Sequence, residues 1–202
     1  MQPTFDQAFQ LLNITRESGA SLETLQAVFQ GFLPDLLKAE KLPNREEFRK
    51  LLGYDPSVFK VKMGGANNTD EITAALGFPF NDWITQANFP LTASETPTED
   101  EIEIVDPGKS FSEEEGLAIL KEKGLLRPTY EHGIRFAEQH GKATTSEKKP
   151  FVIFLHEAWQ DPYRDRRIVY LDRFAFCRKL YLLYPGVRFG GDCVLAGVRP
   201  RK

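Results

Sequence analysis

Few of the side chains that carry out chemistry are spaced in this 202-residue chain so that they can act together. His156 and Glu157 are adjacent, and a carboxylate beside an imidazole can tune that imidazole for acid–base catalysis near neutral pH. The same pair at the end of a strand is more often structural, because a perturbed catalytic group also needs a cleft and a partner. His132 and His140 lie eight residues apart, which is two helical turns and too far for a shared metal ion.

The two cysteines and the known sequence motifs offer little further chemistry. Cys177 and Cys193 are too few for a disulfide scaffold or a cysteine-built zinc site, so we expect both thiols to be reduced and buried. The chain has no P-loop, dinucleotide-binding glycine motif, His-Glu-x-x-His, calcium loop or Gly-x-Ser-x-Gly elbow. We therefore expect no metal, no cofactor and no enzymatic activity.

Basic and aromatic residues are concentrated towards the C-terminal end. Residues 148–202 carry twelve Lys and Arg against five Asp and Glu, whereas residues 1–100 carry eight against fourteen. A basic segment with interleaved aromatic residues is typical of nucleic-acid binding. The alternation also fits strands whose aromatic side chains are core and whose arginines face water. Both interpretations remain open from these residues alone.

The first 92 residues are predicted to form a mainly helical N-terminal region. Apolar residues recur there at helical intervals, and Asn44 and Glu47 have the spacing of a capping box. Residues 93–100, ASETPTED, are polar and acidic and contain a proline, which is typical of a linker. The predicted elements are helices at 4–15, from 22 to Pro34 or with a kink to 37, and at 44–52, a strand at 58–63, a short helix starting at 69, and ordered loops at 78–84 and 88–91.

The second half, residues 101–202, combines strands with two helices. Ser112 and Glu115 have the capping-box spacing at the start of one helix, which Gly124 should end. Thr129 is placed to cap a second helix over Tyr130–His140. This mixture predicts an α+β fold class. The predicted strands are 101–105, 151–155, 168–171, 179–183 and 193–198.

Three features of this half carry a resemblance to a known fold. They are the helix after Ser112, the corner Lys123–Thr129 (KGLLRPT) and the final segment Asp192–Arg199 (DCVLAGVR). Together they resemble the C-type lectin fold, in the branch shared by formylglycine-generating enzymes and the variable proteins of diversity-generating retroelements. They are also similar to uncharacterised proteins of candidate-phyla bacteria.

The resemblance implies a helical N-terminal region followed by a C-type-lectin-like mixed α/β domain, whose last strand lies beside its first. The chain departs from the family at Gly197, where a β-branched residue is usual. The family's catalysis does not carry over, because Cys177 and Cys193 are sixteen residues apart rather than a close pair. Calcium-dependent sugar binding does not carry over either, since no Glu-Pro-Asn, Gln-Pro-Asp or Trp-Asn-Asp triplet is present.

What the resemblance does imply is a rigid sheet that displays ligand-binding side chains from its C-terminal segment. Trp, Tyr and Arg also dominate the energetics of binding interfaces. We therefore predict a non-enzymatic display protein that binds a protein or other macromolecular ligand, with nucleic-acid binding as the alternative. The predicted ligand-binding residues are Trp159, Tyr163, Arg164, Arg173, Phe174, Phe176, Arg178, Tyr184, Arg188 and Phe189.

The sequence also gives an expectation about location. No stretch approaches the roughly 18 consecutive apolar residues of a membrane helix, and the N-terminus lacks the basic-then-apolar layout of a signal peptide. We predict a cytoplasmic protein without a membrane partner, with surface display or delivery to a host as alternatives. Ligand identity and oligomeric state stay open.

Overall fold

The computed structural model describes residues 55–91, 94–142, 146–174 and 178–201, together with Glu23 and Ala27. Contacts divide the chain between residues 56 and 57, and Ser57–Lys202 forms one compact unit. The predicted helices at 4–15, 22–37 and 44–52 lie outside the described residues, apart from Glu23 and Ala27.

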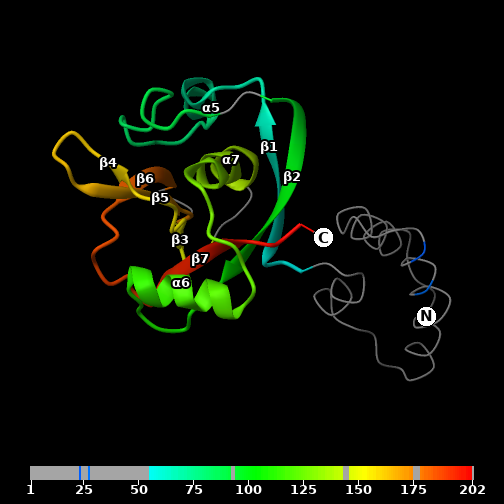
Figure 1. Ribbon diagram of the computed structural model, residues 1–202, viewed down its shortest axis with the longest axis vertical. Helices are drawn as coiled ribbons and strands as arrows, with labels where there is room; N and C mark the ends of the chain where they lie inside the picture. Colours follow the sequence, from blue (N-terminus) through cyan, green and yellow to red (C-terminus); the bar gives the residue numbers. More distant parts are fainter. Residues whose placement is uncertain are drawn as a thin grey trace, which may run out of the picture. The chain divides into compact units, whose positions relative to one another are not determined.

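In the described part of this unit, three helices pack against one curved sheet of seven strands (Figure 1). This is an α+β arrangement, as predicted, and the strands and helices forecast for residues 101–202 all occur. The elements are β1 (Val58–Gly65), α5 (Thr69–Ala75), β2 (Ser94–Val105), α6 (Glu113–Glu122), α7 (Tyr130–His140), β3 (Phe151–Ile153), β4 (Trp159–Gln160), β5 (Arg166–Asp172), β6 (Lys179–Leu183) and β7 (Cys193–Val198).

The strand order is β1-β2-β7-β3-β5-β4, with β6 paired to β5. Strands β3 and β7 run parallel, and the other pairs are antiparallel. The last strand, β7, thus pairs with β2, the strand that contains residues 101–105. Figure 1 shows the two side by side in the middle of the sheet.

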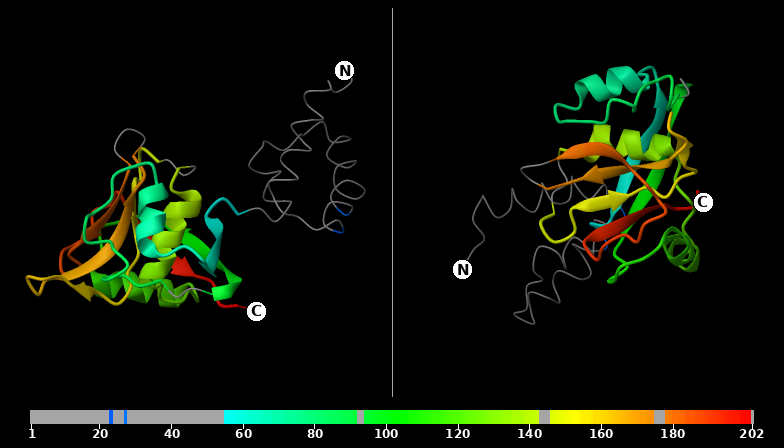
Figure 2. Two further views of the ribbon diagram at one scale, coloured as in Figure 1. Left: turned by 90° about the horizontal axis from the view of Figure 1, so that it is seen from above. Right: turned by 90° about the vertical axis from the view of Figure 1, so that its left-hand side faces the viewer.

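Strict alternation along the central strands separates two apolar layers, one on each face of the sheet. Val152 and Phe154 join the layer under α7, whereas Ile153 and Leu155 join the layer under α6. Successive strand residues point to opposite faces, so a fully apolar run is what a strand covered on both sides requires. Helix α5 lies beside α7, on the same face of the sheet as α7 (Figure 2).

The two helices after residue 105 begin where the capping residues predict. Ser112 accepts the Glu115 N–H at 3.2 Å, and the Glu115 carboxylate accepts the Ser112 N–H at 2.8 Å. Thr129 adopts the extended N-cap conformation before α7. Gly124 follows α6 with a φ of 70°, a left-handed conformation that glycine adopts without strain.

The structure differs from the prediction of a linker at residues 93–100. Ser94–Asp100 belongs to strand β2 and pairs with β1 over most of its length. The predicted N-terminal region of residues 1–92 is also divided differently, because β1 and the segment up to Leu91 share the core of the second half. Ile84 and Phe89, both fully buried, pack in the same apolar layer as Ile134 of α7.

The physical reason for this error is that the outer end of β2 forms a two-stranded ribbon with β1. Only Asp100 is buried among residues 96–100, so the segment needs no apolar residues to be a strand. In the sequence Pro97 favours a linker, but in the structure it lies within β2 where the β1–β2 register shifts near Gly64. Proline is tolerated at such irregularities because no ladder hydrogen bond is required there.

Gly197 permits the close approach of α6 to the sheet. A Cβ atom at this position would lie 2.8 Å from Leu120 Cδ2 and 2.9 Å from Leu125 Cβ. Gly197→Ala should therefore lower the free energy of unfolding by about 1–3 kcal/mol through overpacking. Gly191→Ala is the control, because its Cβ meets nothing within 4 Å. Equal urea midpoints for both variants would contradict this explanation.

Candidate functional site

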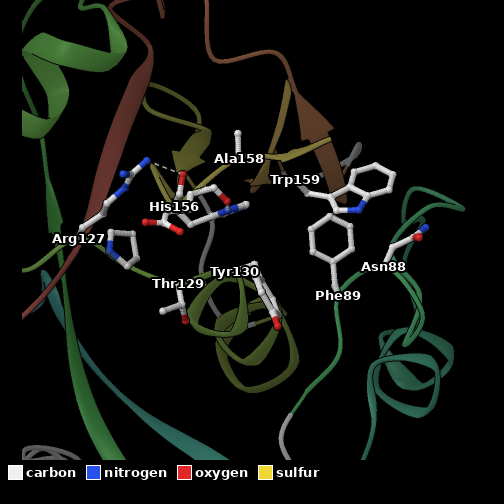
Figure 3. A pocket seen from close by; sticks show the side chains of 10 residues that line it. Asn88, Phe89, Arg127, Thr129, Tyr130, His156, Ala158 and Trp159 are labelled. Atoms are coloured by element: carbon white, nitrogen blue, oxygen red, sulfur yellow. Dashed lines mark hydrogen bonds between the residues drawn. The ribbon is translucent and has the colours of Figure 1, made fainter. Parts of the chain in front are cut away.

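A cleft of about 460 Å³ lies at the N-terminal end of α7. Its walls come from the loop before β2, the corner before α7 and the segment between β3 and β4 (Figure 3). The lining residues are Asn88, Phe89, Arg127, Pro128, Thr129, Tyr130, His156, Glu157, Ala158 and Trp159.

His156 at the back of the cleft is a structural residue rather than an acid–base group. Its Nε2 accepts the Val169 N–H at 2.8 Å, and its Nδ1 lies 2.6 Å from the Glu157 carbonyl oxygen. The ring is 1% exposed, and burial lowers its pKa to about 4. The imidazole is therefore neutral at pH 7 with both nitrogens engaged by the backbone, which argues against the catalytic interpretation of the His156–Glu157 pair.

Arg127 holds the same segment from the other side. Its Nε donates to the Leu155 carbonyl at 2.6 Å, and its Nη2 donates to the His156 carbonyl at 2.8 Å (Figure 3). Nη2 also lies 3.6 Å from the Glu113 carboxylate. Arg127 thus fixes one rim of the cleft. In the sequence Arg127 is notable only as part of the KGLLRPT corner, and no local pattern indicates its hydrogen bonds to residues 155 and 156.

Aromatic rings form the opposite wall. Phe89 lies between Trp159 and Tyr130, with ring centroids 5.2 Å and 5.6 Å away. The Tyr130 hydroxyl donates to the Pro90 carbonyl at 2.7 Å, which fixes this ring. Figure 3 shows the Trp159 and Phe89 rings next to each other at one side of the cleft, with Tyr130 nearby.

The aromatic wall continues outward onto the β4–β5 hairpin. Trp83 lies 6.1 Å from Trp159 and 6.2 Å from Tyr163, whose side chain is 77% exposed. The hairpin turn is rigid because Asp161 accepts the backbone N–H groups of Tyr163 and Asp165, each at 2.9 Å. We call the five rings Tyr163, Trp83, Trp159, Phe89 and Tyr130 the aromatic wall.

A hydrogen-bonded chain of Thr129, His132 and Asp100 lies next to the cleft. Thr129 Oγ1 is 2.8 Å from His132 Nδ1, and His132 Nε2 is 3.2 Å from Asp100 Oδ2. The order of groups is that of a hydrolytic triad. However, Nδ1 also accepts the Thr129 backbone N–H at 3.0 Å, and the Thr129 hydroxyl points to α7 rather than to the aromatic wall (Figure 3). These hydrogen bonds therefore hold the N-terminal end of α7 in place.

The predicted ligand-binding residues do not form one surface. Trp159 and Tyr163 belong to the aromatic wall, and Arg164 lies in the adjoining turn with a φ of 68°. Phe176 lies outside the described residues. Phe174, Tyr184 and Arg188 are exposed but do not line the cleft, and Arg178 is half-buried.

Two of these residues were predicted to be exposed and are buried. Phe189 is 2% exposed, because it stacks on Phe111 at 5.0 Å in the layer under α6. Arg173 is 8% exposed and donates to the Lys149 carbonyl at 2.8 Å. The sequence pattern missed these positions because strand ends and loops have no period that separates the core face from the solvent face.

Many basic residues of the C-terminal segment are neutralised within the unit. At least six of the twelve between residues 148 and 202 form ion pairs, which reduces the positive charge available to a phosphate backbone. The pairs are Lys149–Asp106, Arg166–Glu113, Arg167–Asp161, Arg188–Glu115, Arg199–Glu103 and Arg201–Asp100.

Metal and thiol chemistry finds little support in the described ranges. No group of three or more His, Cys, Asp or Glu side chains there lies close enough to hold a metal ion. Cys193 is a free, buried thiol as predicted, and burial raises its pKa to about 11. Cys177 lies outside the described residues.

The environment of His156 predicts a specific loss of stability in acid. Its folded-state pKa of about 4 lies below the usual 6.5, so the neutral ring stabilises the fold fully above pH 6.5. This contribution, about 3 kcal/mol at 1.36 kcal/mol per pKa unit, should be lost as the pH falls from 6.5 to 4.

Urea titrations of the wild type and His156→Gln between pH 7 and 4 test this. The glutamine amide can replace both hydrogen bonds but does not titrate, so the variant should show a shallower fall in unfolding free energy. An NMR titration midpoint near 6.5 for His156 would contradict the assignment.

Within the described residues no helix is long and apolar enough to cross a membrane. No protein family, curated protein or solved structure matches the chain, so the function has to be argued from the cleft and its aromatic wall.

Proposed function

We propose that this protein is a non-enzymatic binding module and that its aromatic wall takes apolar side chains of a protein ligand. One observation carries the proposal: five aromatic rings run without a break from the exposed Tyr163 to Tyr130 inside the cleft. Rigid aromatic side chains lose little conformational entropy on binding, and they dominate the affinity of protein interfaces.

The polar rim of the cleft supports a peptide-like ligand. Arg127 and Glu157 offer opposite charges at one end, and Asn88 adds an amide. A cleft of mainly apolar walls with a few fixed polar groups is the usual form of a binding site. The fixed backbone around His156 and Arg127 also means that little ordering is needed when a ligand enters, which favours affinity.

Nucleic-acid binding remains the alternative, and the ion pairs weigh against it. Duplex binding relies on several free cations that replace counterions along the phosphates. Arg166 and Arg167, which flank the aromatic wall on β5, are both paired with carboxylates at 2.9 Å. The protein-ligand proposal needs no such cations, because aromatic contacts are insensitive to salt.

The finer fold assignment, a C-type-lectin-like domain of the kind found in retroelement variable proteins, also stays a proposal. The pairing of the last strand, β7, with β2 supports it, as does the helix–corner–helix order of α6 and α7. Among the predicted positions that the structure describes, Trp159, Tyr163 and Arg164 lie at or beside the aromatic wall, which narrows the display hypothesis to these residues.

Photo-crosslinking from position 163 tests the proposed function. Tyr163→p-benzoylphenylalanine should crosslink a defined protein in cells, and adding Trp83→Ala should remove that product. The same replacement at Tyr184, which is 45% exposed and does not line the cleft, is the matched control. A nucleic-acid adduct, with affinity falling by a log–log slope of about −0.9 per phosphate contact, would favour the alternative.

Tyr163→Ala should then weaken binding of the captured protein at least ten-fold, which is about 1.4 kcal/mol. Its unfolding free energy should change by less than about 0.5 kcal/mol, because the side chain is mostly exposed. Binding equal to that of Tyr184→Ala would exclude the aromatic wall as the binding surface.

A further inference from the structure

Two arginines flank the connection between β5 and β6, away from the cleft. The last residue pair of this hairpin is Asp172 with Lys179, so Arg173 follows β5 and Arg178 precedes β6 at opposed positions. The Arg173 N–H still donates to the Pro150 carbonyl at 2.8 Å, which holds this residue beside the start of β3. The two arginines therefore lie at the two ends of the loop that connects β5 and β6.

Both guanidinium groups are incompletely satisfied. Arg173 is 8% exposed and Arg178 is half-buried, and the Nε of each is buried without a hydrogen-bond acceptor. In the part of the chain that the structure describes, neither arginine forms an ion pair. The adjacent Asp172 does not compensate them, because its Oδ1 accepts the Phe174 N–H and strand alternation directs it to the other face of the sheet.

This arrangement is costly without a counterion. A buried guanidinium that lacks an anionic partner loses hydration without recovering it, and like charges at opposed positions of a hairpin repel each other. For Arg173 burial alone lowers the pKa, with no carboxylate acting in the opposite direction. An oxyanion between the two side chains would supply both the missing acceptors and the missing negative charge.

We propose that Arg173 and Arg178 form a binding site for a phosphoryl group. Arginine is the preferred partner of phosphate because its planar fork presents parallel N–H donors, and two arginines match a dianion. The partial exposure of Arg178 gives the anion an approach from solvent. The site is independent of the aromatic wall, so it stands or falls separately from the proposed function.

Thermal unfolding at constant ionic strength tests the site, with sodium phosphate or glycerol 3-phosphate replacing sodium chloride. Ligand that binds only the folded state raises Tm, here by about 2–4 °C for each kcal/mol of linkage. We expect a rise of about 2–4 °C at a ligand concentration several-fold above Kd. A larger rise with the ester than with inorganic phosphate identifies a phosphorylated molecule as the ligand, and equal rises identify the free ion.

Arg178→Gln is the decisive variant, because Arg178 is the less buried of the two. It should abolish the phosphate-dependent rise and should not lower Tm in chloride, since it removes a positive charge that has no anionic partner among the described residues. Arg188→Gln is the matched control: this exposed arginine is paired with Glu115 at 2.9 Å and should keep the full rise. Equal Tm values in phosphate and chloride, or a rise that survives in Arg178→Gln, would overturn the site.

Discussion

The fold depends on how the chain is held where β3 leaves the sheet. After Phe154, whose N–H still donates to the Val169 carbonyl at 3.2 Å, the backbone bends away from β5, and its polar groups would be buried without partners. Arg127 donates to the carbonyls of Leu155 and His156, while the His156 ring accepts the N–H of Val169 that the departing strand no longer reaches. The side chains of Arg127 and His156 thus make the hydrogen bonds that strand pairing no longer provides at this bend. Since an unsatisfied buried polar group costs about 1–3 kcal/mol, these three hydrogen bonds stabilise the bend.

The same hydrogen bonds position the cleft. Arg127 comes from the corner between α6 and α7, so its bonds to the segment after β3 also fix the start of α7 against the sheet. Tyr130 begins that helix, and Trp159 follows the bend by three residues. The aromatic wall is therefore assembled from parts that the clamp already holds. A ligand at this cleft would meet a preformed surface, so little loss of conformational entropy would oppose its binding.

Local signals made much of the fold predictable, and long-range contacts made the site hard to see. Ser112 and Thr129 mark helix starts through their own geometry, and the apolar run at 151–155 marks a strand covered on both faces. Trp83 and Phe89 lie in a loop without periodicity, so nothing in the sequence indicates that they meet Trp159. The buried Phe189 illustrates the same limit, because its partner Phe111 is 78 residues away. Strand β2 was mistaken for a linker since a ribbon needs no apolar face.

Part of the positive charge at the C-terminal end is balanced inside the unit once the strands are paired. β2 carries Asp100 and Glu103, and the residues that follow its neighbour β7 include Arg199 and Arg201, which lie within 2.9 Å of those carboxylates. Two of the basic residues at the C-terminal end are thus paired with carboxylates of β2 across one antiparallel contact. Such half-exposed pairs contribute little stability each, but they oppose a register slip that would face like charges with each other. An excess of positive charge in a segment therefore indicates an external anionic partner only where the cations have no carboxylate partner inside the protein. Among the described residues of this unit, Arg173 and Arg178 are in that position.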